Sequence, residues 1–194
     1  VNTPATVTTT SPATAITGIS ATADGNVTDA GCGTISARGI CYGTATNPDI
    51  TGTKTTETGT TGAFSSNITG LTPATTYYYR AYVTSSVTTS YGAEFSFTTL
   101  AVAPTVVTNA ATAVSGSGAT LNGTVNANNS STAVTFEYGL TTAYGSTVNA
   151  TPATVTGTSG TSVSYVLSGL TPNTTYHFRA VGVNVAGTTN GGDL

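Results

Sequence analysis

The stretch that decides the fold is Gly70-Leu71-Thr72-Pro73-Ala74-Thr75-Thr76-Tyr77-Tyr78-Tyr79-Arg80-Ala81. It returns as Gly169-Leu170-Thr171-Pro172-Asn173-Thr174-Thr175-Tyr176-His177-Phe178-Arg179-Ala180, and the second copy begins 99 residues after the first. A repeat of that period is the size of one β-sandwich domain. A chain of 194 residues has room for two. We therefore expect one domain over residues 1–100 and a second over residues 101–194.

Each copy reads as a turn followed by a strand. Pro73 and Pro172 fix φ and lack an amide donor, which suits the corner before a strand and not its middle. Inward and outward positions then alternate: Tyr77, Tyr79, Ala81 and Val83 against Tyr78, Arg80 and Tyr82. Such alternation in a run rich in aromatic residues predicts a half-buried antiparallel strand.

The spacing Leu-x-Pro-x-Thr-x-Tyr resembles the E–F corner and F strand of fibronectin type III-like domains. The resemblance implies an all-β chain of two tandem immunoglobulin-like antiparallel sandwiches. It also implies a tyrosine corner, in which the hydroxyls of Tyr77 and Tyr176 bond back to nearby backbone. The stretch 37–43, followed by Asn47-Pro48, is similar to a subfamily abundant in surface proteins of Bacteroidetes-type bacteria. An extracellular or cell-surface location is what this second resemblance implies.

Composition excludes several classes of protein. No segment has the apolar period of a helix, so we expect essentially no helix. Only four residues are Lys or Arg and the net charge is −3, which argues against nucleic acid as a partner. No apolar run approaches the roughly 18 residues of a membrane span, so we expect no membrane insertion.

The remaining strands follow from alternation and turn signals. In the first half we expect strands over residues 4–10, 14–23, 38–43, 50–56, 64–71 and 91–99, with a turn-rich loop over residues 24–33. After a stiff apolar linker over residues 100–104, the second half repeats the order over residues 104–109, 119–127, 133–139, 146–155, 161–170 and 174–186. Glu137 and Arg179 then fall on neighbouring strands as a cross-strand ion pair, whereas Cys41 faces Arg80 in the first half.

The second half aligns with the first only as far as Leu194, which matches Phe95. The equivalents of residues 96–99 are missing, so the second sandwich is expected to lack most of its last strand. Two explanations stay open. The sequence is a window cut from a longer array, or the chain forms a polymer in which a strand of an adjoining chain fills the gap.

The two cysteines, Cys32 and Cys41, are too few for a structural zinc site even with the lone His177. If residues 34–43 form one extended strand, Cys41 lies far from Cys32 for a disulfide. An intrachain bridge requires the preceding loop to fold back. Separate thiols and a bridge to a neighbouring chain are the alternatives.

No arrangement of residues indicates catalysis, a cofactor or a metal ion. His177 has no marked Ser or Cys partner. The carboxylates are scattered, and none form an obvious acid/base pair: Asp24, Asp29, Asp49, Glu57, Glu94, Glu137 and Asp193. Asp24 to Asp29 faintly resembles a calcium loop but lacks the carboxylates of an EF-hand, so we favour turn chemistry there.

The outward face formed by Tyr78, Arg80 and Tyr82 is the one candidate binding face, suited to stacking on sugars or on a partner protein. The sequence thus predicts a non-catalytic extracellular structural module: a stalk, spacer or filament subunit whose partners are neighbouring modules or copies of itself. The alternatives are an adhesion or glycan-binding module and an accessory domain of a secreted carbohydrate-active enzyme.

Overall fold

The computed structural model describes residues 2–194, and every regular element in that part of the chain is a β-strand. The chain divides into two compact units, residues 1–100 (unit 1) and residues 101–194 (unit 2). Within residues 2–194 there is no helix long and apolar enough to cross a membrane.

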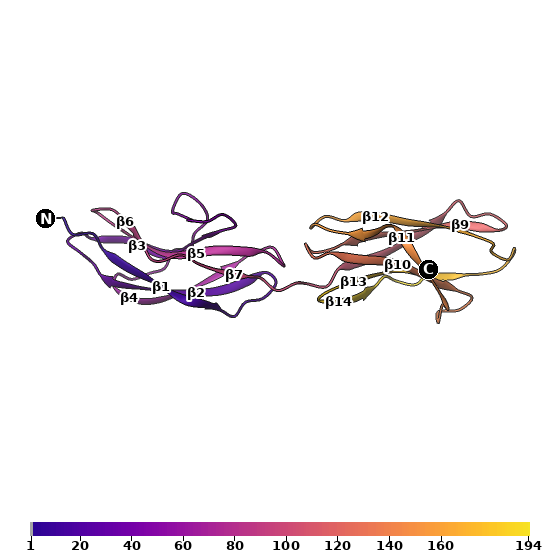
Figure 1. Ribbon diagram of the computed structural model, residues 1–194, viewed down its shortest axis with the longest axis horizontal. Coiled ribbons are helices and arrows are strands. Elements are labelled where there is room, and N and C mark those ends of the chain that lie inside the picture. The colour runs from indigo at the N-terminus through magenta and orange to yellow at the C-terminus, as the bar shows by residue number, and fades with distance from the viewer. Residues whose placement is uncertain (1) are drawn as a thin grey trace. The chain divides into compact units, whose positions relative to one another are not determined.

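Unit 1 consists of two antiparallel sheets (Figure 1). The first has the order β1-β2-β4, and the second has the order β3-β5-β6, with β7 also paired to β5. The bounds are β1 Thr6–Thr14, β2 Ser20–Asp29, β3 Ile35–Gly43, β4 Gly62–Thr69, β5 Thr76–Ser85, β6 Thr89–Tyr91 and β7 Phe95–Thr98.

Unit 2 repeats this order with β8-β9-β12 and β10-β13-β14. One strand, β11, pairs with β10 and also bridges β12 through Thr151 and Ser164, so the two sheets are joined along one path. The bounds are β8 Thr105–Thr112, β9 Gly118–Asn126, β10 Thr132–Gly139, β11 Ser146–Val155, β12 Thr161–Ser168, β13 His177–Asn184 and β14 Gly187–Asn190. Two tandem immunoglobulin-like, fibronectin type III-like sandwiches confirm the expected fold class.

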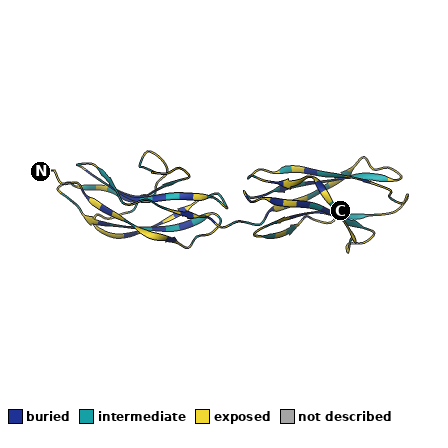
Figure 2. Cartoon of the chain, viewed as in Figure 1, coloured by how far each residue is buried: buried dark blue, intermediate teal, exposed yellow. Residues whose placement is uncertain are grey.

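The repeated stretch forms the corner that follows the last strand of one sheet and the first part of the central strand of the other. On β5 the predicted inward residues are all buried, and Tyr79 and Ala81 are completely enclosed. Figure 2 shows the resulting alternation of buried and exposed positions along the strands. Tyr79 also packs against Phe97, with ring centroids 5.7 Å apart, so the aromatic run contributes directly to the core.

The expected turn-rich loop over residues 24–33 is wrong for its first part, because β2 continues to Asp29. Gly25, which suggested a turn, lies at an inward position of this strand. A Cβ atom there would come within 2.5 Å of the Phe64 ring and 2.8 Å of Ala81. Glycine is therefore required by close packing between the sheets.

A strand was expected over residues 50–56, but this segment is not a regular strand. Asp49 organises a turn there, since its carboxylate accepts the N–H of Thr51 at 2.8 Å and its carbonyl accepts that of Gly52 at 3.2 Å. Beyond the turn the chain runs beside β3 through isolated pairs such as Cys41 with Lys54. This segment therefore covers the edge of β3 without forming a strand of its own.

The last strand of unit 1 is also different from the expected single run over residues 91–99. It is divided into β6 and β7, which pair with successive parts of β5. Unit 2 contains the first of these two pieces as β14, paired with β13. Of the residues equivalent to β7, the described chain contains Leu194, the counterpart of Phe95. Leu194 exchanges two backbone hydrogen bonds with Phe178.

Arg38 lies at the edge of the unit 1 core, although the sequence indicates only an ordinary strand position. Its side chain is buried, and its guanidinium donates to the carbonyls of Thr58 at 2.6 Å, Thr61 at 3.1 Å and Gly62 at 3.1 Å. The group also lies 5.0 Å from the centroid of the Phe64 ring. The buried charge is thus compensated by several backbone carbonyls at once. The planar guanidinium can bond all of them, whereas the compact ammonium of a lysine cannot.

We expect Arg38→Ala and Arg38→Lys each to lower the free energy of unfolding of unit 1 by about 2–3 kcal/mol, because several hydrogen bonds to a buried charge are lost. Denaturant unfolding followed residue by residue by NMR separates the two units. Lys54→Ala is the control, since its ammonium is exposed and, among the described residues, donates to the carbonyl of Ile50 alone. A Lys substitution as stable as the parent would contradict this role.

Candidate functional site

The candidate binding face of unit 1 is largely covered. Tyr82 lies opposite Gly39 on β3 and is only 1% exposed. Its hydroxyl donates to the carbonyl of Thr55 at 2.9 Å, in the segment that runs beside β3. The expected exposure of Tyr82 is therefore wrong, because the sequence does not show that residues 50–57 fold over this end of the sheet.

Arg80 is half-buried on the same face and binds the turn between β3 and β4. Its Nε donates to the carbonyl of Pro48 at 2.5 Å and its Nη2 to that of Asn47 at 3.4 Å. The guanidinium also lies 4.0 Å from the centroid of the Tyr91 ring. Of the three predicted residues, Tyr78 alone remains partly exposed without a contact of this kind, so the face is not an open stacking platform.

The two cysteines are not joined in the structure. Cys41 is buried opposite Arg80 on β5, and Cys32 is exposed in the turn before β3. Burial raises the pKa of the Cys41 thiol to about 11, despite the opposing charge of Arg80. Cys41 is consequently a protonated core side chain at neutral pH and not a nucleophile.

Unit 2 has a charged cluster at the place where Arg80 lies in unit 1. Arg179 on β13 pairs with Glu137 on β10, with Nε and Oε2 2.7 Å apart, which confirms the cross-strand ion pair expected from the sequence. The same guanidinium lies 4.7 Å from the centroid of the Tyr144 ring. Because both side chains of the pair are roughly a third exposed, the pair contributes on the order of 0.2–1 kcal/mol.

His177 and Asp193 extend this cluster toward the end of unit 2. His177 Nδ1 and Asp193 Oδ2 are 2.8 Å apart, and the Tyr144 hydroxyl donates to Asp193 Oδ1 at 3.0 Å. An ionised carboxylate only accepts hydrogen bonds, so Nδ1 carries the proton. Within residues 2–194, the imidazole is hydrogen-bonded to Asp193, and no Ser or Cys side chain is hydrogen-bonded to it.

We call this connection of Asp193 to His177 and Tyr144 the carboxylate latch. Unit 1 has a related contact, in which the carboxylate of Glu94 accepts the backbone N–H of Asn47. Glu94 and Asp193 are 99 residues apart and both follow the first piece of the last strand. In each unit a carboxylate thus ties the last strand to the turn after the third strand, a structural function that sequence spacing alone does not reveal.

The latch lowers the pKa of the Asp193 carboxyl below its ordinary value of 3.8, chiefly through the hydrogen bond from His177. The pKa of the Tyr144 hydroxyl is raised, first by desolvation and then by its hydrogen bond to Asp193 and the charge of that carboxylate. Neither shift creates an acid or base that works near neutral pH. The geometry fits a positional contact and gives no support to proton transfer.

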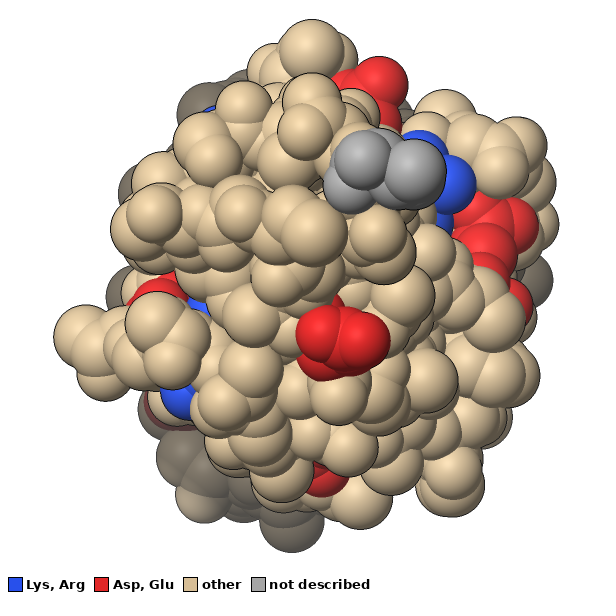
Figure 3. All heavy atoms as spheres, turned by 90° about the vertical axis from the view of Figure 1, so that its left-hand side faces the viewer, with Lys and Arg blue, Asp and Glu red and all other residues tan. Residues whose placement is uncertain are grey.

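Charged side chains are sparse elsewhere. Figure 3 shows one face on which acidic and basic groups are scattered over a mostly uncharged surface. Over the described part of the chain, no three His, Cys, Asp or Glu side chains lie together in a way that could hold a metal ion.

The latch gives a pH prediction. A carboxyl whose folded pKa is depressed adds stability above its unfolded pKa, and this stability is lost as pH falls through the folded pKa. We expect the amides of Phe178 and Leu194 to exchange faster as pH is lowered from about 5 to about 2, after correction for intrinsic rates. Asp193→Asn should remove this pH dependence; equal pH dependence in parent and variant would contradict the latch.

Comparison with known proteins adds little beyond the fold. No protein-family model matches the chain, and no curated protein matches it. Among solved structures, it is similar to the crystal structure of the chicken CNTN1 FN1-FN3 domains, with 16% sequence identity and a TM-score of 0.46. The match covers 98% of this chain and 64% of that one. The conclusion on fold rests on the strand order itself: each unit is a fibronectin type III-like sandwich.

Proposed function

We propose that the chain is a non-catalytic, extracellular structural module, a spacer that carries tension between neighbouring modules of a surface or secreted protein. The observation that supports this most strongly is a set of hydrogen bonds that fix the chain where it enters each sandwich and where it leaves unit 1. Fibronectin type III-like domains are commonly extracellular, which agrees with this role.

The exit of unit 1 is held by a compact set of hydrogen bonds. The N–H of Thr99 donates to the carbonyl of Thr75 at 3.0 Å, and its buried hydroxyl donates to the carbonyl of Thr72 at 2.7 Å. One residue later, the N–H of Leu100 donates to the carbonyl of Thr17 at 3.0 Å. The chain therefore leaves unit 1 bound to the turn after β1 and to the corner before β5.

The entries are held as well. In unit 1 the carbonyl of Thr3 accepts the N–H of Cys32 at 3.0 Å. In unit 2 the side chain of Asn184 donates to the carbonyl of Val102 at 2.9 Å, and that of Asn128 to Ala103 at 2.7 Å. Force applied along the chain loads these bonds at the ends of the sandwiches, which suits a spacer under tension.

The glycan-binding alternative has less support. It depended on an exposed face of Tyr78, Arg80 and Tyr82, and the structure buries Tyr82 and commits Arg80 to the neighbouring turn. We therefore do not propose it for this face.

Single-molecule force spectroscopy tests the proposal. The chain should unfold in two discrete events, one for each unit. Thr99→Val keeps the shape and removes the buried hydroxyl, so the unfolding rate of unit 1 should rise about tenfold. Thr98→Val is the matched control, since within residues 2–194 its exposed hydroxyl bonds the hydroxyl of Thr76 alone. An unchanged unfolding force in Thr99→Val, or gradual extension with no discrete event, would contradict a tension-bearing module.

A further inference from the structure

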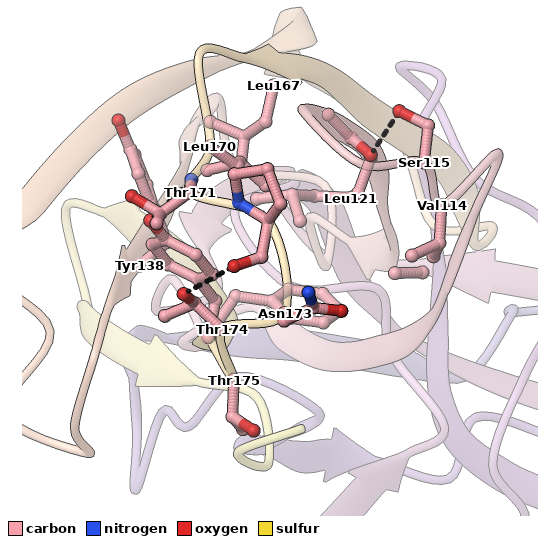
Figure 4. Close-up of a pocket in the computed structure, with 16 residues that line it drawn as sticks. Val114, Ser115, Leu121, Tyr138, Leu167, Leu170, Thr171, Asn173, Thr174 and Thr175 are labelled. Carbon is pink, nitrogen blue, oxygen red and sulfur yellow. Dashed lines mark hydrogen bonds between the residues drawn. The ribbon is translucent and has the colours of Figure 1, made fainter.

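Unit 2 contains two hollows that differ in chemistry. The first lies at the corner that joins β12 to β13 and is lined mainly by apolar side chains (Figure 4). Leu121, Leu167 and Phe178 in its wall are buried core residues. This hollow is therefore an extension of the sandwich core and offers few groups that could orient a polar ligand.

The second hollow is polar and has a volume of 450 Å³. Its floor is a row of three side chains on neighbouring strands. Thr147 of β11 lies opposite Glu137 of β10, and Glu137 lies opposite Arg179 of β13. Directly opposed residues share one face of a sheet, so a hydroxyl, a carboxylate and a guanidinium stand side by side. We call the space above this row, bounded by residues 142–146, the polar cleft.

The wall of the polar cleft is the turn that joins β10 to β11. At Gly139 a Cβ atom would lie 1.9 Å from the carbonyl oxygen of Tyr144, so the turn folds closely against the end of β10. The Tyr144 ring lies 4.7 Å from the Arg179 guanidinium, and its hydroxyl is held by Asp193 at 3.0 Å. The cleft is thus preformed, which lowers the ordering cost of binding.

The floor of the polar cleft has hydrogen-bonding groups that the protein does not use. Arg179 donates through Nε to Oε2 of Glu137 at 2.7 Å. Its two Nη groups, and Oε1 of Glu137, bond none of the described residues. Each side chain is roughly a third exposed, so these groups are accessible from the cleft. The polar cleft is the part of the outward face of unit 2 that stays open.

Unit 1 satisfies the equivalent arginine from within. Arg80 donates to the carbonyls of Asn47 and Pro48, in the turn after β3. The residues 99 positions later are Ser146 and Thr147, which begin β11 and pair with β10. Because this segment is a strand in unit 2, its carbonyls do not cover the guanidinium. The internal acceptors of unit 1 show that an arginine at this place can bind two neighbouring oxygen atoms at once.

The residue opposite the arginine decides what kind of ligand fits. In unit 1 it is Cys41, a buried thiol, and in unit 2 it is Glu137. The carboxylate balances the charge of Arg179, so the pair favours neither an anion nor a cation. The Nη groups offer donors and Oε1 offers an acceptor, and adjacent hydroxyls of a sugar ring satisfy both because each can donate and accept.

The lining of the polar cleft favours a sugar over a peptide. Apart from Ala143, every side chain that lines it carries a polar atom. Peptide recognition relies on pockets for the side chains of the ligand, and those pockets are mostly apolar. The exposed hydroxyls of Ser146 and Thr147 instead add further partners for a ligand rich in hydroxyls.

We propose that the polar cleft is a binding site for a neutral saccharide. One ring hydroxyl accepts from the Nη groups of Arg179, and the adjacent hydroxyl donates to Oε1 of Glu137. The site is independent of the tension-bearing role, because it concerns what unit 2 binds and not how the ends of the sandwiches are held.

The test is an NMR titration of the 194-residue chain with maltose, cellobiose and lactose as neutral probes. Shifts are followed at Glu137, Thr147 and the Nε of Arg179. Arg80 in unit 1 is the internal control, since its guanidinium is already bonded to carbonyls. Glucuronic acid and glucosamine are the charged comparators.

We expect saturable shifts confined to the polar cleft with at least one neutral probe, with a Kd on the order of 1 mM. The Kd should be the same at low and high salt, because the ligand carries no charge. Glu137→Gln should raise the Kd about tenfold, because a charge-assisted hydrogen bond is lost while the shape is kept. Thr154→Val, at an exposed position of the same strand as Thr147, is the matched control and should leave the Kd unchanged.

Four results would overturn the proposal. They are no saturable shift with any of the three probes, equal shifts at Arg80 and Arg179, an unchanged Kd in Glu137→Gln, and tighter binding of either charged comparator than of the neutral sugars. The amide spectrum of Glu137→Gln, which should match that of the parent outside the polar cleft, separates a lost contact from a lost fold.

Discussion

The hydroxyl of Tyr77 accepts the backbone N–H of Thr72 at 3.0 Å, and the hydroxyl of Tyr176 accepts that of Thr171 at 3.2 Å. Each bond closes the corner that carries the chain from one sheet to the other. The glycine before each corner has a positive φ, 71° at Gly70 and 74° at Gly169, which the turn requires. Since β5 and β13 are the central strands of their sheets, the corner determines where the strands paired with them lie, namely β3, β6 and β7 in unit 1 and β10 and β14 in unit 2.

That constraint explains why the two units use the outward face of the central strand for structure. Arg80 and Arg179 sit in equivalent places and both reach the turn after the third strand, the first through carbonyl oxygens and the second through the Tyr144 ring. Glu94 and Asp193 bind the same turn, through the N–H of Asn47 and the hydroxyl of Tyr144. In each unit the face is occupied by contacts that fasten a turn, which leaves little of it open to a ligand.

The features that the sequence predicts are those set by local periodicity. Two-residue alternation on the central strand and the Glu137–Arg179 pair follow from spacing, and the fold class follows from the 99-residue repeat together with the resemblance of its corner motif to fibronectin type III-like domains. Arg38, Tyr82 and the latch of Asp193 do not, because their partners are carbonyls and side chains of turns far along the chain. Gly25 was misleading for a related reason: glycine suits a turn, and it equally suits a strand where the opposite sheet leaves no room for a Cβ atom.

The central claim is that the tyrosine corner fixes each sandwich separately. Tyr77→Phe removes a hydroxyl while keeping the ring and its packing, and the free energy of unfolding of unit 1 should fall by about 1 kcal/mol with unit 2 unchanged. Residue-resolved denaturant unfolding of this variant and of Tyr176→Phe is the most direct measurement. The account predicts a loss confined to the substituted unit in each case. Full stability in both variants, or a loss shared by both units, would contradict it.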